Sequence, residues 1–258
     1  MLRRGVLALA LAGLAPLAWA QGAVNDGPAT FELATGHFDT TPSANFTGVS
    51  TPLAQDHVFE EGWWYRVQGD PAEKFFPVPD AQDYSGAVAT LTWNDVDGRG
   101  FSAQEVLSVH DSMGPSGCVE SVLTLTNNNP GALPIDVFHA LDMDLAGTSG
   151  GDVGTLLGPA DIGIADGAQT GEYRGLGAGA FLVRPFDAGG ATDVPGLLSD
   201  AGVNDFDDTG LPFAAGDITL GFQWTTVSIP SGGQQTYHVV MAVNTPAVPV
   251  ELMELRVE

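Results

Sequence analysis

Short runs in which apolar and polar residues alternate dominate the chain, and few stretches keep helical spacing for three turns. The clearest run covers residues 135–145. One of its faces carries Ile135, Val137, His139, Leu141, Met143 and Leu145, and the other carries Asp136, Phe138, Ala140, Asp142 and Asp144. Because successive side chains of a strand point to opposite faces, the first face is expected in a core and the second largely in solvent.

The same reasoning predicts eight clear strands, with turns rich in Gly, Asp, Asn and Pro between them. They are 57–67, 87–93, 101–109, 118–126, 135–145, 180–186, 217–229 and 234–244. The turn Pro230-Ser-Gly-Gly233 predicts that the last two strands form a hairpin, and the candidate helices, 195–200 and 204–209, are short. A parallel α/β fold needs crossover helices that the chain lacks. The predicted fold class is therefore all-β, an antiparallel two-sheet β-sandwich of roughly 8 to 12 strands with long Gly/Asp-rich loops.

The first twenty residues have the pattern of a signal peptide. Arg3 and Arg4 precede an apolar stretch, and Ala18-Trp-Ala20 matches the small-x-small form of a cleavage site. A membrane span needs about 20 apolar residues, and this stretch is shorter. We therefore expect cleavage after Ala20, no membrane insertion of the mature protein, and a secreted or extracellular location, with the periplasm as the alternative.

Domain boundaries follow from composition. Residues 21–245 are expected to form a single β-sandwich domain, and two sandwiches joined near residue 150 are the alternative. Residues 246–258 are expected to be a Pro-containing linker and a short C-terminal segment. Residues 147–158 and 187–215 are predicted to be loops. The second is long enough to be functional, partly ordered, or an excursion over the sandwich.

The chain is strongly acidic, with 32 Asp and Glu against 8 Lys and Arg. Nucleic acid and anionic lipid are repelled by such a charge, whereas divalent cations are attracted. The one cysteine, Cys118, provides no disulfide framework and is predicted to be a buried thiol.

No motif of known catalysis is present. The sequence contains no nucleophile elbow, phosphate-binding loop or dinucleotide fingerprint, and its five histidines lack zinc spacing. His139 falls on an apolar face, which favours a hydrogen-bonded core imidazole. Glycoside hydrolysis needs only two acids roughly 5 to 10 Å apart, and Glu60 and Glu61 are the most suggestive pair because Trp63 and Trp64 follow them. Both tryptophans are expected in the core, so no catalytic residue is predicted.

Three aspartates predict a calcium site. Asp142 and Asp144 lie two apart, hence on one strand face, and Gly147 opens a loop that returns Asp152. Carboxylate oxygens that converge on a loop are the ligands that Ca²⁺ prefers. The spacing does not match an EF-hand loop, so calcium is predicted on these three residues without a known motif.

Four segments resemble a known group of proteins. They are Gly62-Trp-Trp-Tyr-Arg-Val-Gln-Gly-Asp70, Leu123-Thr-Leu-Thr-Asn127, Asp142-Met-Asp-Leu-Ala-Gly-Thr148 and Gly216-Asp-Ile-Thr-Leu-Gly-Phe-Gln-Trp224. Together they resemble exported β-sandwich proteins of environmental Gram-negative bacteria, many of which carry a C-terminal PEP-CTERM sorting tail. The chain departs from the sorted members because it ends at Leu255-Arg-Val-Glu258, without the sorting motif. The resemblance implies a sandwich fold and no established reaction.

These observations predict a secreted, non-catalytic β-sandwich protein that acts as an extracellular structural, matrix or adhesive module. A carbohydrate-active enzyme of sandwich fold that uses a carboxylate pair is the alternative, and a glycan- or calcium-binding module is a further one. The expected partners are extracellular glycans or other surface proteins, and nucleic acid is excluded by charge.

Overall fold

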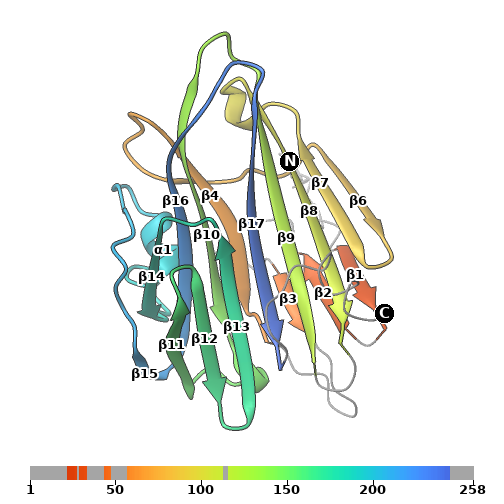
Figure 1. Cartoon of the computed structure of the whole chain (residues 1–258), viewed down its shortest axis with the longest axis vertical. Coiled ribbons are helices and arrows are strands. Elements are labelled where there is room, and N and C mark those ends of the chain that lie inside the picture. The colour runs from red at the N-terminus through yellow and green to blue at the C-terminus, as the bar shows by residue number, and fades with distance from the viewer. Residues whose placement is uncertain (1–21, 28, 34–43, 48–56, 113–115, 245–258) are drawn as a thin grey trace, which may run out of the picture.

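The computed structural model describes residues 22–27, 29–33, 44–47, 57–112 and 116–244. Within them, two antiparallel sheets pack face to face (Figure 1), which confirms the predicted all-β two-sheet sandwich. The two sheets contain more strands, five and nine, than the roughly 8 to 12 predicted. The predicted signal peptide and the C-terminal segment 246–258 lie outside the described residues. No helix among the described residues is long and apolar enough to cross a membrane.

The smaller sheet has five strands. In spatial order they are β14 (Ala180–Pro185), β16 (Ile218–Ile229), β10 (Leu133–Met143), β4 (Glu60–Val67) and β5 (Lys74–Phe75). The larger sheet has nine: β15 (Phe213–Gly216), β11 (Asp152–Gly158), β12 (Asp161–Asp166), β13 (Gln169–Leu176), β17 (Gln234–Val243), β9 (Gly117–Asn127), β8 (Phe101–Asp111), β7 (Val88–Trp93) and β6 (Ala81–Ser85). A third sheet, of β1 (Gly22–Asp26), β2 (Ala29–Leu33) and β3 (Ala44–Thr47), packs against β8 and β4.

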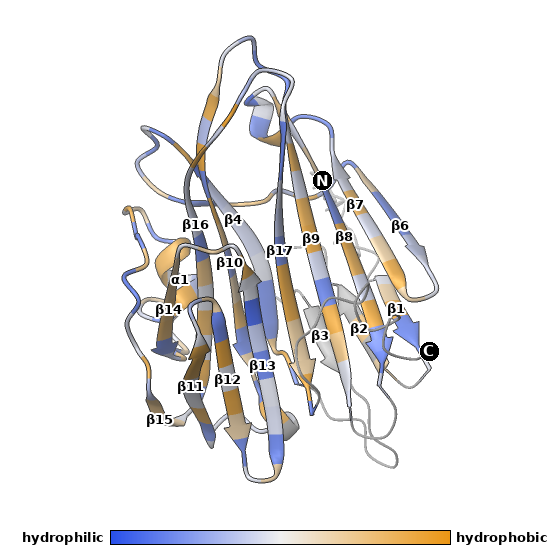
Figure 2. Ribbon diagram, in the orientation of Figure 1, coloured by the Kyte–Doolittle hydropathy of each residue, from blue (hydrophilic) through white to orange (hydrophobic). Residues whose placement is uncertain are grey.

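Each of the eight predicted strands is present, but 152–158, predicted as part of a loop, is strand β11. Gly154 and Gly158 interrupt the alternation of apolar and polar residues in this strand. A side chain at Gly154 would come within 2.9 Å of Ile218, so the glycine lets β11 lie close to the core. Alternating apolar and polar residues are visible along the other long strands in Figure 2.

The predicted hairpin of 217–244 is wrong. β16 pairs with β10 and β14 in the smaller sheet, whereas β17 pairs with β9 and β13 in the larger one. The turn at 230–233 therefore crosses between the sheets. Asn127, at the end of β9, holds this crossing: its side-chain amide donates to the carbonyl of Ile229 at 2.9 Å, and its backbone amide donates to Gly233 at 3.0 Å.

The outer face of β10, predicted to be solvated, is buried. Phe138 and Ala140 are fully buried and Asp142 is 2% exposed, because the segment 187–215 folds back over the smaller sheet. This segment contains the short helix α1 (Val194–Leu198), which begins where the Asp193 carboxylate accepts a hydrogen bond from the Gly196 amide. α1 lies within the predicted 195–200 helix apart from its first residue, while 204–209 is not helical. The segment and the sheet share one apolar cluster. The sheet contributes Trp64, Phe138, Ala140 and Leu182, and the segment contributes Val194, Leu198 and Phe206.

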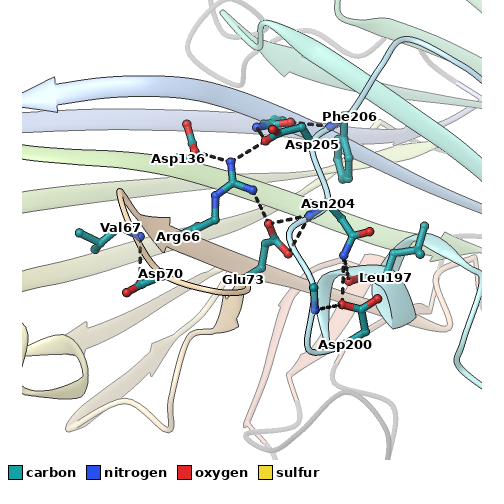
Figure 3. A network of polar contacts seen from close by, with 12 residues as sticks. Arg66, Val67, Asp70, Glu73, Asp136, Leu197, Asp200, Asn204, Asp205 and Phe206 are labelled. Atoms are coloured by element: carbon teal, nitrogen blue, oxygen red, sulfur yellow. Dashed lines mark hydrogen bonds and ion pairs between the residues drawn. The ribbon is translucent and has the colours of Figure 1, made fainter.

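A buried arginine, Arg66, forms ion pairs that connect the segment 187–215 to the smaller sheet (Figure 3). The guanidinium of Arg66 on β4 lies 2.5 Å from Glu73, 2.6 Å from Asp136 and 2.5 Å from Asp205. Glu73 also accepts the backbone amide of Asn204 at 3.1 Å. The long excursion is thus an ordered layer over the outer face of the smaller sheet.

Candidate metal centre

Three carboxylates meet where β10 ends and β16 begins. The register pairs Asp142 with Thr219 and Met143 with Ile218. One further step along this register brings Asp144 opposite Asp217. Residues two apart on a strand share a face, and directly opposite residues also do so. An oxygen from each of Asp142, Asp144 and Asp217 consequently lies within 4.8 Å of the others.

One oxygen of each of these carboxylates lacks a hydrogen-bond donor. Oδ1 of each of the three aspartates is buried without a hydrogen-bond partner. No ion pair with a Lys, Arg or His side chain reaches them among the residues that the structure describes. Burying a charged carboxylate without a partner is costly. Since Ca²⁺ is bound at 2.3 to 2.6 Å, one ion can contact oxygens about 4.8 Å apart. The arrangement could therefore hold a metal ion.

The electrostatics of the centre reflect the same lack of a counter-charge. Burial, followed by the charges of Asp144 and Asp217, raises the pKa of Asp142 to about 9. Burial, followed by the charge of Asp144, raises the pKa of Asp217 to about 6, although a hydrogen bond with Asp142 opposes this shift. Two more acids add to the negative charge. Glu60 lies opposite Asp142 on β4, and Asp193 caps α1.

Asp152, the third predicted ligand, lies beside this centre and is not one of its three converging carboxylates. It is the first residue of β11, is fully buried, and neither of its carboxylate oxygens has a hydrogen-bond partner. Its pKa is raised to about 7 by burial and by the charges of Asp166 and Asp144. The structure thus brings together Asp142 and Asp144 as predicted and adds Asp217, which the sequence analysis did not select.

Glu60 and Glu61 do not form a pair. As neighbours on β4 they point to opposite faces of the smaller sheet, so they cannot flank a single glycosidic bond. Glu61 faces the inter-sheet core, where its Oε2 lies 2.8 Å from His139 Nε2. Trp63 and Trp64 are 3% and 0% exposed, which confirms that both are core residues.

A polar network fills part of the inter-sheet core. His139 Nδ1 lies 2.7 Å from the Tyr173 hydroxyl, and that hydroxyl donates to the His139 carbonyl. Nearby, the Ser121 hydroxyl donates to Glu105 at 2.6 Å, and the Trp63 indole donates to Ser121 at 3.0 Å. All of these side chains are buried, so the network confirms His139 as a hydrogen-bonded core residue and offers no open catalytic surface.

A groove of about 860 Å³ opens beside the three aspartates. Glu60 and Asp193 line it, and the same two carboxylates act electrostatically on Asp142. The groove therefore lies next to the three aspartates, with Glu60 and Asp193 common to both surroundings.

Comparison with known proteins gives a likeness of fold only. No family model matches the chain, and the search of curated proteins finds no match. A bacterial glucoamylase solved with acarbose is 12% identical with a TM-score of 0.53; the match covers 92% of this chain and 34% of that one. A putative aldose 1-epimerase from Escherichia coli K12 is 8% identical, with coverage of 88% and 99% and a TM-score of 0.49. The chain spans about a third of the glucoamylase, and at this identity the likeness describes the sandwich fold and no activity.

Proposed function

We propose that the protein is an exported calcium-binding β-sandwich module that performs no catalysis and acts as a structural or adhesive component outside the cell. The observation that carries this proposal is the convergence of Asp142, Asp144 and Asp217 with an unpartnered, buried oxygen on each. The resemblance of four sequence segments to exported β-sandwich proteins supports the location.

The ligand set favours calcium over other common metals. Its three donors are carboxylate oxygens, with no histidine or cysteine among them. Zinc sites in proteins are built mainly from nitrogen and sulfur, whereas hard cations take oxygen. Mg²⁺ demands near-ideal octahedral geometry and is usually held by one or two carboxylates plus water. Three carboxylates around one position suit the larger and more adaptable Ca²⁺.

A bound calcium ion would link two strands to the covering layer. Asp142 lies near the end of β10, Asp144 directly follows that strand, and Asp217 directly precedes β16. The Asp217 carbonyl also accepts the amide of Phe186, where the excursion begins, at 3.0 Å. A bound cation would reduce the repulsion among the three carboxylates at the point where residues 187–215 leave the sheet. An ion that binds only the folded state adds about 2.7 kcal/mol of stability at a hundredfold excess over its Kd.

Thermal unfolding of the mature protein tests the proposal. We expect the Tm to rise with CaCl₂ and to rise less with NaCl of equal ionic strength. Asp142→Asn should abolish the calcium-specific rise. Asp83→Asn, the same substitution at an exposed position on β6, should retain it. Equal responses to both salts would mean that screening of the acidic surface is the whole effect, and the calcium site would be rejected.

Two further measurements test export and the absence of catalysis. N-terminal sequencing of secreted material should begin at Gln21, and recovery of protein that retains Arg3 and Arg4 would contradict export. Incubation with plant, algal and bacterial glycans should release no more reducing ends than a heat-unfolded control. Release above that control would contradict the non-catalytic proposal and favour a carbohydrate-active enzyme.

A further inference from the structure

The groove beside the metal centre has the dimensions of a ligand site. Its volume, about 860 Å³, lies within the roughly 300 to 1,000 Å³ of small-molecule pockets. One wall comes from β4 and β5, and the other from the start of the excursion and α1. The lining side chains that matter for recognition are Glu60, Phe75, Phe186, Asp187, Asp193 and Asp200.

The two phenyl rings offer fixed apolar surface. Phe75 packs edge-on against Trp64 with ring centroids 4.8 Å apart, and it occupies the space above Gly62, where a Cβ would come within 2.4 Å of the ring. Phe186 packs edge-on against Phe59 at 6.4 Å. Neighbouring rings thus orient both phenyl groups, and each is partly exposed. Such rings can contact the C–H face of a sugar.

Backbone amides orient the groove's carboxylates. Asp187 accepts hydrogen bonds from the Gly189 and Ala191 amides and from the Thr192 hydroxyl, and Asp200 accepts from the Gly202 amide and the Asn204 side-chain amide. A carboxylate has about four acceptor positions, so Asp200 retains about two of them for a ligand and Asp187 about one. Hydroxyl groups supply the donors that these acceptors need, without requiring a counter-charge.

Charge narrows the class of ligand. Among the described residues that line the groove, four are acids and none is Lys, Arg or His, so an anionic ligand is repelled. An organic cation would be attracted, but the whole chain has 32 acidic against 8 basic residues, so it would be attracted over the entire surface. What distinguishes this groove from that surface is its concavity, its two rings and its oriented acceptors.

We propose that this groove binds a neutral oligosaccharide, stacked on Phe75 and Phe186 and hydrogen-bonded to Asp187 and Asp200. A second part rests on the proposed calcium site: calcium strengthens sugar binding. Glu60 and Asp193 line the groove, and their negative charges also act on Asp142. An ion at the three aspartates would relieve repulsion at this end of the groove and hold the first residues of the excursion in place.

Isothermal titration of the full mature protein tests both parts. The neutral probes are maltohexaose, cellohexaose, laminarihexaose and xylohexaose; the charged probes are oligogalacturonate and spermidine. Each is titrated in EDTA and in CaCl₂. We expect one neutral oligosaccharide to bind with a stoichiometry of one, at least threefold more tightly in calcium, and no binding of oligogalacturonate.

Variants assign the binding to the groove. Phe186→Ala should weaken sugar binding about tenfold or more, and Leu157→Ala, which truncates an apolar side chain 60% exposed on β11, should leave it unchanged. If Phe186→Ala does not fold, Asp200→Asn serves as the second variant and should weaken binding with no loss of calcium-dependent stabilisation.

The outcomes separate the two proposals. Failure of every neutral probe, or saturable binding of spermidine alone, overturns the oligosaccharide groove whatever calcium does to the Tm. Sugar binding that calcium does not change overturns the coupling. Sugar binding without any calcium-specific rise in Tm supports the groove and removes the metal site, so failure of one proposal is not read as failure of the other.

Discussion

His139 Nε2 lies 2.8 Å from Glu61 Oε2 in the buried core between the two sheets. Burial raises the pKa of Glu61 to about 8 and lowers the pKa of His139 to about 3, so both are neutral near neutral pH. The Tyr173 hydroxyl donates to the His139 carbonyl, which leaves its oxygen to accept Nδ1–H. Nε2 then accepts the proton of the Glu61 carboxylic acid. The contact is therefore a neutral hydrogen-bond chain and not an ion pair.

This protonation state predicts an alkaline loss of stability. Glu61 and Glu105, whose pKa burial raises to about 7, keep protons in the folded state that the unfolded chain loses near 4.5. Their contribution to stability is complete below pH 4.5 and decreases as the pH rises through 7 and 8. In Glu61→Gln the side-chain amide can still donate to His139, but it does not ionise. We expect this variant to lose less stability than the wild type between pH 6 and pH 9.

Urea denaturation at the two pH values, in EDTA, measures the difference. One pKa unit corresponds to about 1.4 kcal/mol, and the two proteins should differ by at least about 1 kcal/mol in their loss. Parallel loss in both proteins would mean that Glu61 already ionises below pH 6. Ionisation of the buried aspartates near β10 also lowers stability at high pH, but it does so equally in the wild type and in the variant, so it cancels in the comparison.

Strand positions could be predicted because alternation is a local property. Residues 135–145 and 101–109 carry their pattern in a single window, and both are strands. Which strands pair is not local. The alternation of 217–229 and 234–244 is the same whether they form a hairpin or face each other across a core, so the crossing at 230–233 was missed.

The site depends on the same long-range information. Asp142 lies in β10 and Asp144 directly follows its last residue, so their proximity follows from a period of two. Asp217 joins them only through the register of β10 with β16, which no local pattern encodes. The burial of the outer face of β10 could not be predicted for a similar reason. This face is covered by residues 187–215, a segment whose composition resembles that of an ordinary loop. Asp142, an acidic residue on that face, is consequently buried.

A second prediction concerns Arg66. Its guanidinium faces Glu73, whose side chain is fully buried, and Asp136, whose side chain is 12% exposed. Arg66→Leu would leave both acids without their counter-charge, a change that costs about 3 to 5 kcal/mol when a buried pair is broken. Arg99→Leu breaks the more exposed pair with Asp70 and should cost about 1 kcal/mol or less. Equal losses in urea denaturation of the two variants would show that the Arg66 network adds no special stability.

A third prediction concerns Gly196 in α1. Alanine is normally favoured over glycine in a helix by about 1 kcal/mol. A Cβ at Gly196, however, would lie 2.2 Å from the Gly190 carbonyl oxygen and 2.7 Å from the Asp193 carboxylate. Gly196→Ala should therefore push residues 187–191 away from α1, lower the Tm and speed proteolysis in that loop. Gly131→Ala, which meets nothing within 4 Å, is the control and should do neither. A rise in Tm for Gly196→Ala would contradict the close contact.

The last prediction separates Asp217 from Asp152 as the third calcium ligand. Asp217 offers an oxygen within 4.8 Å of those of Asp142 and Asp144, whereas Asp152 is buried beside them without belonging to that group. Asp217→Asn should lose most of the calcium-dependent rise in Tm, because asparagine replaces a charged ligand by a neutral one.

Asp152→Asn should keep that rise and, in EDTA at pH 8, should also unfold at a higher temperature than the wild type. The reason is that burial raises the pKa of Asp152 to about 7, so at pH 8 a buried negative charge without a hydrogen-bond partner is removed. Calorimetry of both variants with and without CaCl₂ measures the two effects. Loss of the calcium response in Asp152→Asn, with retention in Asp217→Asn, would reverse the assignment and return the site to the set that the sequence alone predicts.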